Sequence, residues 1–200
     1  MKQRFSRTVI AVLAVFIGLY PFLYLFLNEK FGLLSTKTES LLSDITWRIC
    51  FYAHIFSGGL TLIIGWTQFN DSWRKAKTFI HRTVGKIYIV GVWISSITGL
   101  YVACYATGGI ISATGFMSLA IIWFVTTTLA YTNVKEKNFI KHRQWMIYSY
   151  ACCFAAVTLR LWLPFLSALS GDFILAYRVV AWLSWVPNLA VAFYIQRKSS

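Results

Sequence analysis

The chain has 200 residues, 58% of them hydrophobic and 12% charged, and its formal net charge is +13. Long apolar stretches in such a composition indicate an integral membrane protein and leave no sequence for a soluble domain. The basic residues fall between the apolar stretches and at the chain ends, which indicates a role in membrane topology and argues against nucleic-acid binding.

Six apolar stretches are each near the ~20 residues that a helix needs to cross the hydrocarbon. They predict an all-α fold, in which a single transmembrane domain of six helices occupies residues 1–200. The predicted spans are 8–28, 45–69, 83–105, 113–132, 144–166 and 173–195. The first span follows three basic residues but lacks a small-x-small cleavage pattern, so we expect an uncleaved helix and not a signal peptide.

Basic residues are distributed unevenly over the connections between spans. Segments 71–82 and 133–143 and both chain ends are rich in Lys and Arg, whereas the other connections carry few basic residues. The positive-inside rule then predicts that both termini and both basic segments are cytoplasmic. We expect a multi-pass protein of the bacterial inner membrane, with the lipid bilayer as its partner and anionic lipid near the basic segments.

Three predicted spans carry a stripe of small and polar residues at spacings of three and four, which places each stripe on one helix face. The stripes include His54 and Gln68 in the second span, His81 and Tyr88 in the third, and His142 and Arg160 in the fifth. Such stripes let membrane helices pack closely, and by themselves they predict a packed bundle without indicating an activity. Their ends predict two polar layers, one inner and one outer.

The inner layer contains two His-Arg pairs, His81–Arg82 and His142–Arg143, each at the start of an apolar run. One interpretation is interfacial: the arginines bind lipid phosphate and the imidazoles lie among the headgroups. The other is a cofactor site, because two histidines at matching depth on parallel helices can be the axial ligands of one haem b.

A haem at this place would have Arg82 or Arg143 at its propionates and Tyr88 among the aromatic residues around it. A quinone headgroup hydrogen-bonded by either histidine is the alternative, with Gln68 at the same end of the bundle. A metal ion bound by the two histidines would need a third ligand, and neither a carboxylate nor a thiol is evident nearby.

The predicted outer layer contains His54 and Arg160. His54 either makes a helix-to-helix hydrogen bond or lines an outward pocket. Arg160 either extends to the outer interface or meets Asp44, Asp172 or an anionic ligand, because a buried charge without a partner is costly. We predict a small water-accessible cavity on the outer side, lined by His54 and Arg160.

Several kinds of chemistry lack support in the sequence. No Asp or Glu lies deep in a predicted span, which argues against a proton pump or a cation-coupled transporter built on a buried carboxylate. The four cysteines have no metal-ligand spacing, so we expect them to act as small apolar side chains. Neither a Ser-His-acid nor a metal-hydrolase spacing appears, which argues against hydrolytic catalysis.

The motifs HIFSGGLTLIIGWTQF, HRTVGKIY, KHRQWMIYSYACCFAAVTLRLWLP and WVPNLAVA, in this order, resemble a bacterial membrane-protein family catalogued as domain of unknown function 2306. The resemblance covers about residues 50–196 and implies a multi-helix membrane fold without an established activity. Its recurrent polar positions are His54, Gln68, Arg74, His81, Arg82, Gly85, Tyr88, His142, Arg143, Trp145, Met146, Arg160 and Asn188. The layout also resembles the cytochrome b561 type, but it lacks the second outer histidine that two bis-histidine haems require.

Two functions from different classes remain open. The first is a membrane redox or cofactor-binding protein with haem b or a quinone at His81 and His142. The second is a non-enzymatic transporter or sensor whose outer pocket around His54 and Arg160 binds a small anionic or neutral molecule, and a membrane assembly factor is a third hypothesis. The sequence decides neither whether the chain is an enzyme nor its oligomeric state.

Overall fold

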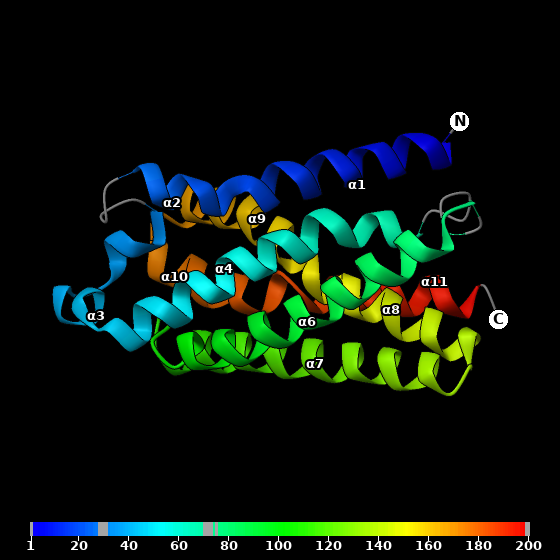
Figure 1. The fold of residues 1–200 in the computed structure, drawn as a ribbon. Helices are drawn as coiled ribbons and strands as arrows, with labels where there is room; N and C mark the ends of the chain where they lie inside the picture. Colours follow the sequence, from blue (N-terminus) through cyan, green and yellow to red (C-terminus); the bar gives the residue numbers. More distant parts are fainter. Residues whose placement is uncertain (1, 28–31, 70–73, 75, 199–200) are drawn as a thin grey trace.

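Six helical spans lie side by side along one axis, with both chain ends at the same end of the bundle (Figure 1). The computed structural model describes residues 2–27, 32–69, 74 and 76–198, and side chains from residue 8 onward. The spans consist of α1 (Lys2–Leu19), η1 (Tyr20–Phe22) and α2 (Leu23–Phe26); α4 (Ile45–Gly65) and η3 (Trp66–Phe69); α6 (Thr78–Ala103); α7 (Ile110–Lys135); α8 (Phe139–Cys153) and α9 (Ala155–Ser170); and α10 (Phe173–Leu183) and α11 (Val186–Arg197). The prediction of an all-α membrane bundle with six spans is confirmed.

Side-chain caps at the aqueous boundaries explain where several helices begin. Asp44 and Asp172 each accept two backbone N–H groups from the first turns of α4 and α10. Asn138 accepts the N–H of Lys141 at the start of α8. Such caps satisfy N–H groups that have no partner within the helix. These two acids at span edges are therefore helix caps.

The described part of the first connection covers the end of the bundle that is remote from the chain termini. It contains η2 (Gly32–Thr36) and α3 (Glu39–Ser43), and Leu34 packs there against Trp47 and Phe51 of α4. The ammonium group of Lys37 donates to the carbonyl of Tyr105 at 2.5 Å and to the hydroxyl of Thr107 at 3.0 Å. The connection is thus fixed to the α6–α7 turn.

The fifth and sixth spans are each divided into two helices near mid-length. The break between α8 and α9 is at Phe154, and the break between α10 and α11 is at Ser184 and Trp185. The apolar pattern over 144–166 and 173–195 predicts a single helix in each place and does not reveal these breaks. The structure also begins α6 and α8 before the predicted spans, at Thr78 and Phe139.

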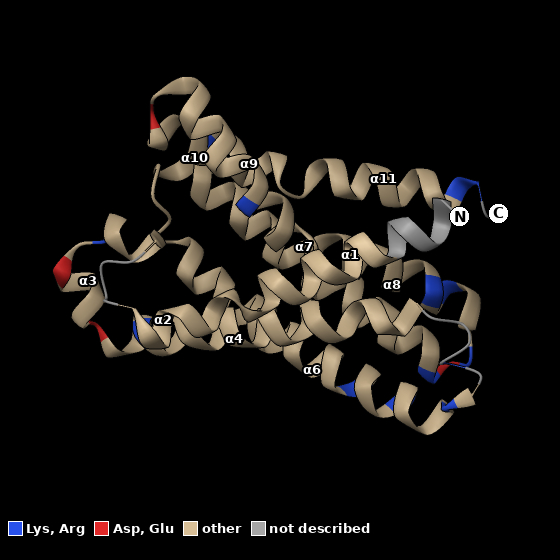
Figure 2. Cartoon of the chain, turned by 90° about the horizontal axis from the view of Figure 1, so that it is seen from above, with Lys and Arg blue, Asp and Glu red and all other residues tan. Residues whose placement is uncertain are grey.

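Charge separates along the bundle axis (Figure 2). The end that holds the chain termini carries Arg74, Lys77, Arg82, Lys86, Lys135, Lys137, Lys141, Arg143, Arg197 and Lys198, with Glu136 as an acid. The opposite end carries Glu39, Asp44 and Asp172 with Lys37, Arg48 and Arg178. We call these the inner and the outer end. The distribution matches the bias that the positive-inside rule describes.

Candidate functional site

The two inner histidines belong to parallel helices that both pack along α7. His81 lies in the first turn of α6 and His142 in the first turn of α8, and both rings are half-buried. Seven residues further along each helix, the hydroxyl of Tyr88 is hydrogen-bonded to that of Ser149 at 2.9 Å. Residues seven apart share a helix face and are ~10 Å apart along the axis. His81 and His142 therefore lie two turns from this contact on the same two faces, and they are within electrostatic range of each other.

A backbone carbonyl fixes the orientation of the His142 ring. Nδ1 of His142 lies 2.8 Å from the carbonyl oxygen of Ala130 on α7. A carbonyl oxygen can only accept, so the proton is on Nδ1 and a neutral ring has its lone pair on Nε2. Metal-ligating histidines usually have this arrangement, in which the other ring nitrogen donates to a carbonyl or carboxylate. His142 is therefore a preoriented acceptor or ligand.

Cationic side chains lie near His81, and an amide lies one turn beyond it. Arg74 and Arg82 are within electrostatic range of His81, and Arg82 and Arg143 are exposed. The side-chain oxygen of Gln68 lies beside Gly85, one turn beyond His81, because a Cβ on this glycine would be 3.6 Å from that oxygen. The inner end thus combines two imidazoles, an amide and several guanidinium groups, a set that favours an anionic or strongly polar ligand.

A chain of buried hydroxyl groups lies two turns below the histidines. Thr127 donates to the carbonyl of Trp123 at 2.8 Å, so its hydroxyl must accept from Ser149, 2.6 Å away. Ser149 in turn must accept from Tyr88, because each hydroxyl has one proton to donate. The proton of Tyr88 is therefore committed to Ser149. Tyr88, predicted as a cofactor-binding residue, is fully buried two turns below the histidines, and its role in binding a cofactor stays a prediction.

The described residues of the inner site do not supply the donor set of a bare metal ion. Among the described residues, no group of three or more His, Cys, Asp or Glu side chains lies close enough together to bind one. A structural zinc ion usually has four protein ligands and a catalytic one three. Two histidines suit haem iron, for which the porphyrin supplies the other four donors.

His54 joins α4 to α6. Its Nδ1 donates to the carbonyl of Ser95 at 2.8 Å, and the hydroxyl of Ser95 donates back to the carbonyl of His54 at 3.0 Å. The ring packs against Gly99, where a Cβ would be 2.6 Å from Nδ1. Of the two interpretations of His54, the structure therefore supports a helix-to-helix hydrogen bond.

Arg160 on α9 points towards the first span. Its guanidinium carbon lies 4.5 Å from the ring centre of Tyr20, and one nitrogen donates to the carbonyl of Ala156 at 3.0 Å. It is also within electrostatic range of His54. These two partners are a π face and a helix carbonyl, and neither bears a formal charge. Among the residues that the structure describes, these contacts stabilise the charge of Arg160 without supplying a counter-charge.

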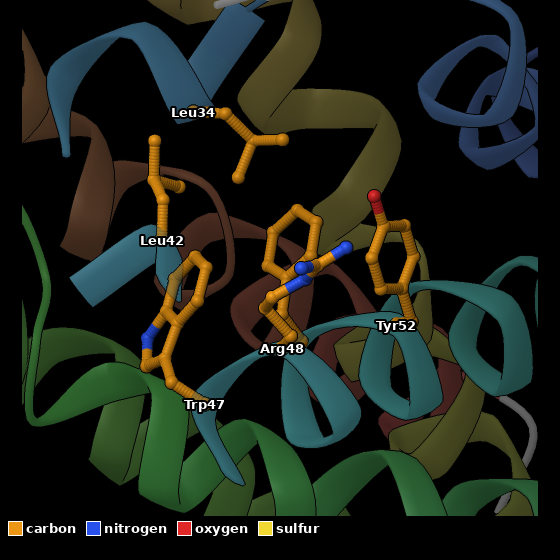
Figure 3. Close-up of a pocket in the computed structure, with 6 residues that line it drawn as sticks. Leu34, Leu42, Trp47, Arg48 and Tyr52 are labelled. Atoms are coloured by element: carbon orange, nitrogen blue, oxygen red, sulfur yellow. The ribbon is translucent and has the colours of Figure 1, made fainter. Parts of the chain in front are cut away.

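A small hollow at the outer end lies against α4 (Figure 3). It is lined by Leu34, Leu42, Trp47, Arg48, Phe51 and Tyr52. Its volume is about 10 Å³, roughly enough for one water molecule. The hollow includes neither His54 nor Arg160, so it is a different place from the predicted outer cavity, which stays a prediction.

Sequence reasoning missed two contributions to the inner site. Thr127 ends the hydroxyl chain, and the carbonyl of Ala130 orients His142; both lie on α7, which the stripe pattern assigns to neither polar layer. The run Thr126-Thr127-Thr128 within an apolar span was the available signal for Thr127. A backbone carbonyl gives no such signal, because every residue has one.

The bundle and its two polar layers define a multi-pass helical membrane protein. The chain belongs to the family described as predicted membrane protein (DUF2306), whose model matches residues 51–196. No curated protein and no solved structure matches the chain. The resemblance found in the sequence is thereby confirmed, and its residue range nearly coincides with the match.

Proposed function

We propose that this chain is a redox protein of the bacterial inner membrane that binds haem b at its inner end through His81 and His142. The observation that carries the proposal is the hydrogen bond from Nδ1 of His142 to the carbonyl of Ala130, which leaves Nε2 as the available ligand atom. His81 begins the facing stripe of α6, on a helix parallel to α8. Bis-histidine ligation from two helices needs this relation between the rings.

The surrounding side chains have separate roles in this proposal. Haem would supply one-electron transfer when bound. Arg82 and Arg143 lie at the aqueous boundary, where guanidinium groups can bind propionates in bidentate fashion. In this proposal Gln68, which lies beside Gly85, and the hydrogen-bonded pair Tyr88 and Ser149 would close the site from the membrane side.

A quinol is the second occupant that the inner site can take. The bare Nε2 of neutral His142 cannot donate to a quinone carbonyl, but it can accept a hydrogen bond from a quinol hydroxyl and take its proton. A bound quinol would keep the redox class of the protein and change its cofactor.

The test is the absorption spectrum of the purified full-length protein after expression with added haem precursor. We expect a Soret band whose position changes on dithionite reduction, and its loss in His81→Ala and in His142→Ala. His54→Gln is the matched control, because His54 is the third histidine of the chain and lies in the outer layer. The control should keep the band.

Two outcomes would overturn haem binding. One is a protein without a Soret band even after titration with haem. The other is a band that persists in both inner-histidine variants. If extraction then yields quinone from the wild type but not from His142→Ala, the quinol alternative holds.

The outer layer supports a second function of a different class, a transporter or sensor for a small anionic or neutral molecule. The specific observation is that the described contacts of Arg160 are a π face and a helix carbonyl, neither of which is an acid, and that Arg160 is within electrostatic range of His54. Arg160→Leu should then abolish binding of that molecule, and Arg160→Lys should weaken its binding, because lysine keeps the charge but loses the planar guanidinium group. Binding at the wild-type level in both variants would exclude a ligand at Arg160.

A further inference from the structure

An open groove lies at the inner end between α7, α8 and α11, apart from the two inner histidines. Its volume is about 750 Å³. The side-chain amide of Gln196 on α11 donates to the carbonyl of Gln144 on α8 at 2.9 Å and ties two of its walls together. The lining residues are Leu129, Thr132, Asn133, Glu136, Lys141, Gln144, Trp145, Tyr148, Phe193, Gln196 and Arg197.

All three walls of the groove change in polarity in the same direction. On α8, Lys141 lies towards the aqueous end, and Trp145 and Tyr148 follow one and two turns deeper. On α11, Arg197 is outermost and Phe193 is one turn deeper. A ligand that fills the groove must therefore have a charged end at the aqueous boundary and an apolar part that extends into the membrane.

The third wall, on α7, repeats this gradient and adds acceptor groups. Glu136 is outermost, Asn133 and Thr132 follow, and Leu129 is deepest. The amide nitrogen of Asn133 donates to the carbonyl of Leu129 at 2.8 Å, which leaves its oxygen free to accept. This wall can therefore accept hydrogen bonds from a headgroup that bears hydroxyl groups.

The charges select among amphiphiles. Lys141 and Arg197 against Glu136 give the groove a net charge of +1 from its lining side chains. This complements a lipid with one phosphodiester and no cationic group. Both basic side chains are exposed, and thus available to a phosphate.

We propose that this groove is a binding site for an anionic glycerophospholipid, with the phosphodiester between Lys141 and Arg197. The headgroup hydroxyls donate to Glu136 and Asn133, and one acyl chain runs along Trp145 and Phe193. A soluble phosphate compound would use the charged rim alone. The apolar half of the groove therefore favours a membrane lipid, and the net charge favours phosphatidylglycerol over phosphatidylethanolamine.

The experiment is native mass spectrometry of the delipidated full-length protein, titrated with phosphatidylglycerol, phosphatidylethanolamine or the chain-free headgroup glycerophosphoglycerol. We expect phosphatidylglycerol to bind at least tenfold more tightly than either comparison compound. The double variant Lys141→Gln/Arg197→Gln should lose this preference. Phe193→Ser should weaken the binding of phosphatidylglycerol and leave the weak binding of the chain-free headgroup unchanged.

The control is Lys86→Gln/Lys135→Gln, which removes the same charge from two exposed inner-end positions outside the groove. It should bind phosphatidylglycerol like the wild type. If the control loses the preference for phosphatidylglycerol as the double variant does, the preference comes from general attraction between charges, and the proposed site is overturned. If the chain-free headgroup binds as tightly as phosphatidylglycerol, the proposal that the ligand is a membrane lipid is overturned. If phosphatidylethanolamine binds as tightly as phosphatidylglycerol, the proposed selectivity by charge is overturned. If the double variant does not fold by circular dichroism, Lys141→Gln and Phe193→Ser singly decide the question.

Discussion

At the scale of single residues, Gly99 decides whether α6 can accept the His54 ring. A Cβ at position 99 would be 2.6 Å from Nδ1 of His54, closer than real Cβ contacts, so Gly99→Ala must displace the ring and weaken its bond to Ser95. We expect a loss of ~1–3 kcal/mol in the free energy of unfolding, as in other overpacked cores. The measurement is chemical unfolding in detergent, followed by circular dichroism.

Gly85→Ala is the matched control for this prediction, because it makes the same change in the same helix. A Cβ at position 85 would meet the Gln68 side chain at 3.6 Å, an ordinary contact. Alanine also has a higher helix propensity than glycine, so the control should be neutral or slightly stabilising. Equal stability of the two variants would contradict the assigned role of His54 as a helix-to-helix contact.

Lys37, in the outer connection, makes the stability of the folded protein depend on pH. Burial lowers its pKa from 10.5 to about 8 in the folded protein. Between these values the unfolded chain binds a proton that the folded chain does not bind, so folding becomes more favourable as the pH rises through this window. We expect the melting temperature of the wild type, relative to Lys37→Met, to increase from pH 7 to pH 10.

A difference in melting temperature between the wild type and Lys37→Met that stays constant from pH 7 to pH 10 would contradict this prediction. It would mean that Lys37 is solvated despite its bonds to Tyr105 and Thr107.

Single residues also show how much of the site the sequence reveals. The seven-residue spacing from His81 to Tyr88 and from His142 to Ser149 is enough, by itself, to place these residues on two inward faces. The commitment of the Tyr88 proton to Ser149 could not be predicted, since it follows from Thr127 on a third helix. Periodicity fixes the face of a side chain, whereas its partner depends on how the helices pack.

At the scale of helices, the two breaks in the fifth and sixth spans are joined by hydrogen bonds. The amide of Asn188 on α11 donates to the carbonyl of Ala151 on α8 at 3.3 Å and to that of Ser184 at 2.9 Å. The hydroxyl of Thr158 on α9 also donates to the carbonyl of Ser184. Interrupted backbone within a membrane is tolerated where protein groups satisfy it, and these two side chains provide such groups.

We therefore expect Asn188→Leu to be destabilising by ~1–3 kcal/mol, because it removes the side-chain donor to the carbonyl of Ala151 and one of two side-chain donors to that of Ser184. The matched control is Asn133→Leu, which removes an amide whose bond to Leu129 lies within one helix. Unfolding in detergent should separate the two variants. A loss as large in the control would show that the helix breaks do not depend on Asn188.

The two breaks differ in what the sequence reveals about them. Pro187 is at the start of α11 and lacks the N–H that would continue the helix from α10, so a break before it could have been predicted. No proline or glycine marks Phe154, the other break. Near this break the amide of Asn188 on α11 donates to the carbonyl of Ala151, a contact that no local pattern in α8 indicates.

At the scale of the whole molecule, the six spans were predictable because the length of an apolar stretch is a local property of the sequence, and the thickness of the bilayer sets the length that a span needs. The separation of charge along the axis was also predictable, because the Lys and Arg content of each connection is a local property of the sequence. The described residues of both basic connections lie at the end with the termini. The groove between α7, α8 and α11 was not predictable, because its walls come from residues 129–136, 141–148 and 193–197. Hollows between helices depend on packing angles that composition does not fix.

The orientation of the molecule in the membrane is the last prediction. The bias in Lys and Arg predicts a cytoplasmic inner end, which leaves Cys104 at the outer end of α6, where its side chain is exposed. Cys152 and Cys153 are buried and Cys50 is half-buried, so Cys104 should react first with a membrane-impermeant maleimide. We expect labelling of wild-type spheroplasts from outside, and its loss in Cys104→Ser.

The inner end can be tested in the same experiment by adding Lys135→Cys to the Cys104→Ser background. Lys135 is exposed in the last turn of α7, so a thiol there should react only after the membrane is permeabilised. The reverse pattern, with Lys135→Cys labelled in intact spheroplasts and Cys104 protected, would place the basic segments outside. The proposed haem site and lipid groove would then face away from the cytoplasm, because both lie at the same end of the bundle as Lys135.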